Sequence, residues 1–306
     1  TQITSIEKPY MQTTNNYIEF KKQRELGEIL SDSFGFIRNE FKPFFGTILK
    51  IVGPYILVML ISMGFYMYTI GDVFNLTTLG GNQFSGFSPI VMVLSVLALI
   101  LSSIAAYVLA QGTVLYYIKS YIEHKGATNY DEIRQGVYSS FWSLIGLGII
   151  VGISVFVGAM FCLIPGIYLA VPLSISFAIL VFLKKDTMDS YQYSFTLIKE
   201  NWWITFATLF VIYIIVMIAT YAFSLPGAIY TWIKMGIFSG EMDAESMNLF
   251  NDPIYLFLNI LSTLVQFLMN IIMLVATSLI FFNLNEKKNF TGTFERIERL
   301  GKSSEE

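Results

Sequence analysis

The most regular feature of the chain is a series of six long apolar runs separated by polar segments. The runs cover roughly residues 44–69, 89–118, 141–164, 166–183, 203–224 and 253–282. A helix needs about 20 predominantly apolar residues to cross the ~30 Å hydrocarbon core of a bilayer. The pattern therefore predicts an all-α, polytopic membrane protein, a bundle of six transmembrane helices.

Charged residues are segregated between the two sides of this predicted bundle. The chain is 55% hydrophobic and 13% charged, and 18 of its 19 Lys and Arg residues lie on one side, with Lys234 the exception. The segments 70–88 and 225–252 are acidic instead; they hold Asp72, Glu241, Asp243, Glu245 and Asp252. By the positive-inside rule both termini are cytoplasmic. We expect a multi-pass membrane protein, N-in and C-in.

The same pattern divides the chain into three parts. Residues 1–25 are a polar cytoplasmic N-terminal arm, residues 26–284 are the six-span membrane domain, and residues 285–306 are a cytoplasmic C-terminal tail. The arm has no apolar core of the kind found in a signal peptide, so we expect the first span to be retained. By composition both tails look disordered.

Three amphipathic segments begin near Leu26, Asp131 and Asp186, and each precedes an apolar run. All three point the same way along the chain, which predicts three parallel repeats, each with a cytoplasmic interfacial helix before a span. The alternatives are sensing of lipid or curvature and an elbow that orients the next span; we favour the elbow. The expected interfacial anchors are apolar and aromatic: Phe34, Ile37, Phe41, Trp142, Phe195, Ile198, Trp202 and Trp203.

Proline and glycine suggest where spans end and where helices approach. Pro165–Gly166 and Pro226–Gly227 are expected to be turns at the outer face, because Pro fixes φ and Gly permits a tight reversal. Gly148 and Gly152 form a G-x-x-x-G pair, which permits close packing of helices. That motif is common and is weak evidence for a dimer.

Short sequence motifs lie in and around these segments: Leu26–Leu30, Ser33-Phe34, Phe36–Asn39, Ile164–Leu169, Asp186–Ser190, Ser194, Leu197, Lys199 and Trp202-Trp203. They resemble a family of bacterial six-span membrane proteins. The family includes the membrane domain attached to some glycerophosphodiester phosphodiesterases and the YciC-like uncharacterised proteins. The resemblance implies a location in the bacterial cytoplasmic (inner) membrane and a three-unit architecture, and it carries over no catalytic residue.

Catalytic chemistry is poorly represented in the sequence. The chain has one Cys (Cys162) and one His (His124), so a Cys/His metal cluster is excluded, and the bodies of the six apolar runs lack carboxylates. Mid-membrane carboxylates are usual in ion-coupled carriers. We therefore predict a non-enzymatic protein with no cofactor, no metal and no nucleic-acid partner.

The sixth run carries a polar stripe of Asn259, Thr263, Gln266 and Asn270 at helical spacing. Such a stripe avoids lipid, so it either hydrogen-bonds neighbouring helices, with Gln111 as one candidate partner, or lines a polar path. We expect an accessory or scaffold subunit whose partners are the lipid bilayer and other inner-membrane proteins. The alternative is a lipid-handling or small-molecule transport protein that uses this stripe.

Overall fold

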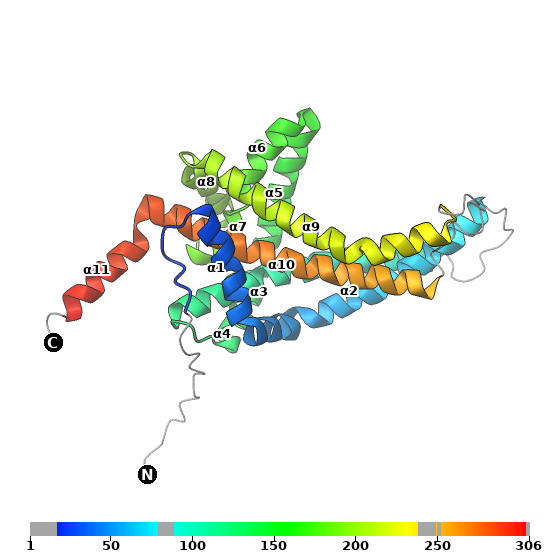
Figure 1. Cartoon of the computed structure of the whole chain (residues 1–306), viewed down its shortest axis with the longest axis horizontal. Coiled ribbons are helices and arrows are strands. Elements are labelled where there is room, and N and C mark those ends of the chain that lie inside the picture. Colours follow the sequence, from blue (N-terminus) through cyan, green and yellow to red (C-terminus); the bar gives the residue numbers. More distant parts are fainter. Residues whose placement is uncertain (1–16, 79–88, 238–248, 250–251, 304–306) are drawn as a thin grey trace, which may run out of the picture. The chain divides into compact units, whose positions relative to one another are not determined.

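The structure is a computed structural model that describes residues 17–78, 89–237, 249 and 252–303 (Figure 1). The acidic residues Glu241, Asp243 and Glu245 lie outside the described residues, as does most of the N-terminal arm. Helices make up the described part of the chain: α1 (Leu26–Asn39), α2 (Phe41–Thr78), α3 (Pro89–Glu123), α4 (Tyr130–Ser139), α5 (Phe141–Phe161), α6 (Leu163–Leu173), α7 (Ser176–Phe182), α8 (Thr187–Ile198), α9 (Trp202–Lys234), α10 (Pro253–Asn289) and α11 (Thr291–Ser303).

Six stretches of helix within these residues are long and apolar enough to cross a membrane, which confirms a multi-pass helical membrane protein. Four of them, α2, α3, α9 and α10, contain 33 to 38 residues each. At 1.5 Å per residue these helices are about 50 to 57 Å long. The other two are the shorter α5 and the interrupted pair α6 and α7.

The predicted turn at Pro165–Gly166 lies inside a helix instead. The chain reverses at Cys162, which is extended (φ −170°, ψ 153°), and α6 begins at Leu163. Pro165 is tolerated there because the first helical turn has no intrahelical partner for its missing N–H. Gly166 serves packing: a Cβ at this position would lie 2.9 Å from Ala159 of α5.

Pro226 and Gly227 also fall within a helix, since α9 continues to Lys234. The predicted end of the fifth span, at residue 224, is therefore corrected by ten residues, or about three turns. Within the described chain a Cβ at Gly148 would lie 3.9 Å from Phe177 and one at Gly152 would meet nothing within 4 Å, so close helix packing at this pair stays a prediction. The tight helix contact is made by Gly158 and Gly166, between α5 and α6.

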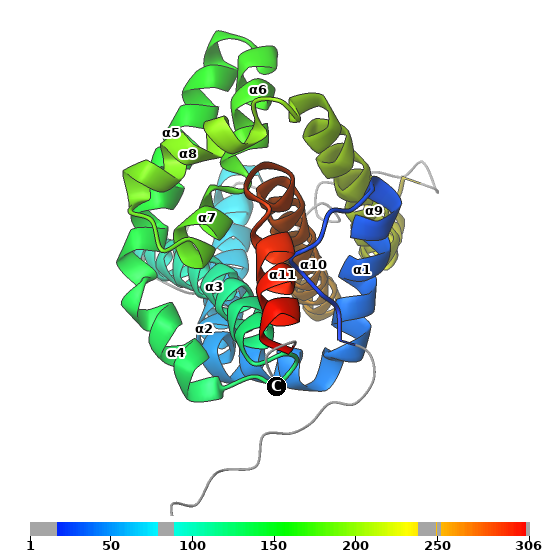
Figure 2. The same ribbon diagram turned by 90° about the vertical axis from the view of Figure 1, so that its left-hand side faces the viewer.

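Two compact units divide the chain. The first unit comprises Thr1–Thr47, Gln111–Leu209 and Leu274–Glu306, and the second comprises Ile48–Ala110 and Phe210–Met273. The core of the first unit is an aromatic cluster around Phe36, whose ring centroid lies 5.3 Å from Phe20, 5.6 Å from Phe44 and 5.2 Å from Tyr121. Within this unit α11 follows directly on the end of α10 and projects outward from it (Figure 1), so that it faces the viewer in the end-on view of Figure 2.

The second unit is built from parts of the four long helices. Phe267 and Ile271 of α10 are buried there, and Tyr107 of α3 lies 5.4 Å from Phe267 between ring centroids. The hydroxyl of Thr263 contacts the sulfur of Met63 on α2 at 3.4 Å. This unit therefore packs mainly through apolar side chains.

The short helices α1, α4 and α8 directly precede α2, α5 and α9, where the amphipathic segments are predicted. The residues that these helices bury within the protein include few of the anchors predicted to contact the membrane. In α1 the buried residues are Ile29, Ser33 and Phe36, whereas Phe34 and Phe41 are exposed. In α8 they are Ser190, Ser194, Leu197 and Ile198. Small serines bring the helices close, so the protein-facing side is not the most apolar side.

Candidate functional site

The polar stripe of α10 divides into two halves with different surroundings. Asn259 and Thr263 are half-buried; the Asn259 amide donates to the Tyr255 carbonyl at 3.0 Å, and Thr263 donates to the Asn259 carbonyl at 2.9 Å. Gln266 and Asn270 are exposed and make no side-chain hydrogen bond with any residue that the structure describes. Both hydrogen bonds of the first half lie within α10, and the contact of this half with another helix is that of Thr263 with Met63. Whether the stripe packs helices or lines a polar path stays a prediction.

Two opposite faces of α10 are exposed in this region. At 100° per residue, Gln266 and Asn270 lie on the side opposite Leu261 and Leu268, which are 45% and 41% exposed. A lipid environment suits the leucine face. Amide groups in hydrocarbon cost several kcal/mol each when they are unsatisfied. The amide face therefore needs a polar partner.

The ends of α10 show how deep these amides lie. Asp252 precedes the helix and Glu286 is in its last turns. Asn270 is 18 residues after Asp252 and 16 residues before Glu286, or about 27 Å and 24 Å of helix. An amide side chain is too short to reach either charged end, so Asn270 lies near the centre of the apolar stretch.

Asp252 is the cap of α10 and ties α9 to it within the second unit. Its carboxylate accepts hydrogen bonds from the Ile254 and Tyr255 amides at 2.9 and 3.2 Å and from the Tyr230 hydroxyl at 2.8 Å. Lys234 lies 3.2 Å away. Burial raises the pKa of Asp252, but these hydrogen bonds outweigh it and bring the pKa down to about 2. We assign this residue a structural role.

The first unit contains a buried charge that the sequence did not reveal. Arg24 is 4% exposed, and its guanidinium donates to Asp32 at 2.9 Å and to the Phe20 carbonyl at 2.8 Å. The Arg24 amide donates to Asn283 Oδ1 of α10 at 2.8 Å. Burial lowers the pKa of the Arg24 guanidinium, and the hydrogen bond to Asp32 opposes that shift. This arginine fastens the segment after residue 17 to α1 and α10.

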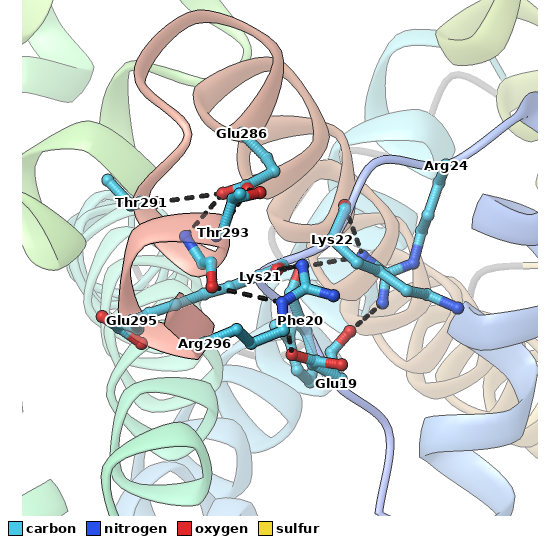
Figure 3. Close-up of polar contacts among 11 residues, drawn as sticks. Glu19, Phe20, Lys21, Lys22, Arg24, Glu286, Thr291, Thr293, Glu295 and Arg296 are labelled. Atoms are coloured by element: carbon cyan, nitrogen blue, oxygen red, sulfur yellow. Dashed lines mark hydrogen bonds and ion pairs between the residues drawn. The ribbon is translucent and has the colours of Figure 1, made fainter. Parts of the chain in front are cut away.

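Glu286 caps α11 from the preceding helix (Figure 3). Its carboxylate accepts from the Gly292 amide at 2.7 Å, from the Thr293 amide at 2.9 Å and from the Thr293 hydroxyl at 2.7 Å. Glu286 is 1% exposed. These donors are the orphan N–H groups of a helix N-terminus, so Glu286 determines where α11 begins.

A second buried carboxylate, Glu40, lies between α1 and α2. It is 4% exposed and accepts a hydrogen bond from the Tyr117 hydroxyl at 2.8 Å. Burial raises the pKa of Glu40, and the hydrogen bond from Tyr117 opposes that rise. Arg24, Glu40 and Glu286 each have hydrogen-bond partners among the described residues.

The predicted interfacial anchors are distributed over several environments. Phe34, Phe41, Trp142 and Trp203 are exposed, as lipid-contacting anchors would be, whereas Ile198 is 1% exposed and belongs to the protein core. Ile37, Phe195 and Trp202 are half-buried. Gln111 is half-buried on α3 in the first unit. Anchoring by the exposed aromatic residues stays a prediction.

Neither a metal-binding group nor similarity to known proteins indicates a function for the described part of the chain. The described residues contain no group of three or more His, Cys, Asp and Glu side chains that could hold a metal ion. Comparisons with protein-family models, curated proteins and solved structures find no match to this chain. The resemblance to the phosphodiesterase-associated membrane domain therefore stays a prediction.

Proposed function

We propose that the protein is a non-enzymatic accessory or scaffold subunit of the bacterial inner membrane, and that it binds another membrane protein through Gln266 and Asn270 of α10. The observation that supports this proposal is the exposure of two adjacent amides, without hydrogen-bond partners in the described chain, near the middle of an apolar helix. The three buried charges of the first unit, by contrast, are satisfied internally.

The chemistry of the two amides specifies the kind of partner. Each amide offers donors and an acceptor, and residues four apart lie on one helix face. The complementary surface is a transmembrane helix that carries amide or hydroxyl side chains at similar spacing. Such interhelical hydrogen bonds contribute on average about 0.6 kcal/mol each, so apolar packing along α10 supplies the rest of the affinity.

For the topology we propose N-in and C-in, with the basic segments cytoplasmic. The α5–α6 hairpin reaches a limited depth in this arrangement. Ile164, the second residue of α6, lines the same groove as Lys199 and Glu200, and the Tyr168 and Trp202 rings stack 5.3 Å apart. Tyr168 is only about 8 Å of helix from the start of α6. If Lys199 lies at the cytoplasmic surface, the presence of the start of α6 in the same groove favours a hairpin tip within the cytoplasmic leaflet.

We therefore propose that α2, α3, α9 and α10 cross the bilayer and that the α5–α6 hairpin enters and leaves the cytoplasmic leaflet. Removing one hairpin removes two crossings, so both termini stay on the same side. The exposed apolar side chains of this hairpin would contact acyl chains: Trp142, Phe156, Met160, Phe161 and Ile164 are all more than 60% exposed.

The hairpin proposal can be tested on the native chain, because its only cysteine, Cys162, lies at the hairpin tip and is exposed to a thiol reagent. We expect a membrane-impermeant maleimide to leave Cys162 unlabelled in cells with an intact inner membrane and to label it after detergent solubilisation. A Glu245→Cys change in a Cys162→Ser chain should label from outside in the same cells. Labelling of native Cys162 from outside would instead establish six crossings.

The scaffold proposal is tested by removing the amides without changing their volume much. Replacing Gln266 and Asn270 together by Leu should leave the protein folded and abundant, because no partner within the described chain loses a hydrogen bond. Recovery of its membrane-protein partner in native detergent should fall by about tenfold or more, a loss of at least ~1.4 kcal/mol. The matched control is Leu261→Ala with Leu268→Ala on the opposite face.

Two results would contradict the proposal. Full retention of the partner by the double leucine variant would show that the amides are not the binding site. A variant that keeps its partner but loses the transport of a small molecule or lipid would favour the alternative, in which the stripe lines a polar path.

A further inference from the structure

An open groove of about 920 Å³ lies in the first unit between α6, α8 and the beginning of α9. Most of its lining is apolar and aromatic, and the polar side chains, called the polar end below, come from the end of α8 and the residues that follow it. The apolar walls consist of Ile164, Ile167, Tyr168 and Pro172 from α6, Phe195 and Ile198 from α8, and Trp202, Trp203 and Ile204 from α9. The polar end is formed by Thr196, Lys199, Glu200 and Asn201.

A hydrogen bond from Trp202 to a backbone carbonyl of α6 holds the aromatic wall in place, and Pro172 leaves that carbonyl free to accept it. Pro172 lacks an N–H, so the Tyr168 carbonyl four residues earlier has no intrahelical donor. The indole N–H of Trp202 donates to that carbonyl at 3.3 Å. The Trp202 ring also stacks on Tyr168 at 5.3 Å and on Phe206 at 5.4 Å. The wall is therefore preformed, which lowers the entropic cost of binding a ligand.

Positive charge is concentrated at the polar end. Lys199 is exposed and forms no ion pair with another described residue. Lys288 donates to the Thr196 carbonyl at 2.7 Å, so a second ammonium group lies beside the groove. Glu200 is the one carboxylate that lines it. Two ammonium groups against one carboxylate leave this end with an excess of positive charge.

We propose that the groove binds an anionic phospholipid, with an acyl chain along the α6 and α9 walls and the phosphate at Lys199 and Lys288. The groove combines an apolar channel with a positive end, which matches an amphiphile that carries a negative headgroup. The volume lies within the range of small-molecule sites, about 300 to 1,000 Å³. This site is separate from the amides of α10 and does not depend on the scaffold function.

Two of the four tryptophans line the groove, which gives a direct measurement. In the full chain with Trp142→Phe and Trp232→Phe, Trp202 and Trp203 report contact with lipid. The protein is reconstituted into phosphatidylcholine vesicles that contain a small fraction of either brominated phosphatidylglycerol or brominated phosphatidylcholine. We expect the brominated phosphatidylglycerol to quench more strongly, with a relative affinity about fivefold higher or more.

Charge variants test the headgroup site. Lys199→Gln should reduce the preference for phosphatidylglycerol about fivefold, because one basic residue near the surface contributes about that factor. Glu200→Gln should raise the preference, since it removes the opposing charge. Lys42→Gln is the matched control, because Lys42 is an exposed lysine that does not line the groove. The control should leave the preference unchanged.

Three results would overturn the proposal. One is equal quenching by the two brominated lipids in the unaltered groove. The second is a Lys42→Gln effect as large as that of Lys199→Gln, which would indicate a general surface charge. The third is a lower preference in Glu200→Gln, because the carboxylate would then not oppose the headgroup.

Discussion

The two units differ in whether their polar side chains are buried and hydrogen-bonded within the chain. In the first unit, Arg24, Glu40 and Glu286 are at most 4% exposed, and each has hydrogen-bond partners within the chain. In the second unit, Gln266 and Asn270 are exposed on an apolar helix and have no partner in the described chain. Removing the partner of a buried charge lowers the stability of the fold strongly. Substituting an exposed amide that has no hydrogen-bond partner in the described chain costs little stability. The comparison indicates a structural role for the buried charges and supports the proposal that the amides bind a partner.

The largest expected effect on stability comes from Arg24. Arg24→Ala leaves the Asp32 carboxylate and the Phe20 carbonyl without their buried donor, and breaking one partner of a buried pair costs about 3–5 kcal/mol. Equilibrium unfolding in detergent micelles measures this loss. Arg38→Ala, at an exposed position of α1, should change stability by less than about 0.5 kcal/mol. An equal loss of unfolding free energy in the two variants would contradict the structural role assigned to Arg24.

A smaller effect is expected at Glu286. Glu286→Ala leaves the buried Gly292 amide without an acceptor, which costs about 1–3 kcal/mol. Hydrogen exchange at the amides of Gly292 and Thr293 should accelerate, and α11 should fray from its start. Glu295→Gln, which breaks a largely exposed ion pair with Lys21, should cost less than about 1 kcal/mol. Unchanged exchange in Glu286→Ala would show that α11 does not depend on this cap.

The pH dependence of Glu40 should be smaller still, and its sign is fixed. Its pKa is raised in the folded state, so the folded protein binds the proton more tightly than the unfolded chain does. The stabilising contribution is full below the ordinary carboxyl pKa of about 4.3 and is lost as pH rises through the raised pKa. Glu40→Gln keeps an acceptor for Tyr117, so it should remove this slope and be at least as stable at neutral pH. A wild-type minus variant difference independent of pH would contradict this account.

The sequence predicted the apolar helices well, because each needs only a long run of apolar residues. The predicted turns and helix ends were wrong where a contact between elements, and not the local sequence, determines the backbone conformation. Pro165 and Pro226 are tolerated inside helices, and Gly166 is required by the approach of Ala159. The α11 helix was missed because its start depends on Glu286, a residue of the preceding helix.

The candidate site was predicted only in part, for a similar reason. Helical spacing placed Asn259, Thr263, Gln266 and Asn270 on one face, and the structure agrees with that placement. Spacing cannot show which of the four are covered by a neighbouring helix. The contact of Thr263 with Met63 and the exposure of Gln266 and Asn270 follow from the packing of α2 against α10.

Site-specific photocrosslinking on α10 tests the central claim most directly. A photoreactive residue at position 266 should crosslink in cells to one membrane protein, at a polar residue within a transmembrane helix. The same group at position 268, on the opposite face, should react with lipid alone. The adduct at position 266 should disappear when Asn270 is replaced by Leu. Lipid adducts at both positions, or crosslinks to a second copy of this chain, would contradict the proposal that α10 binds a different membrane protein through its amides.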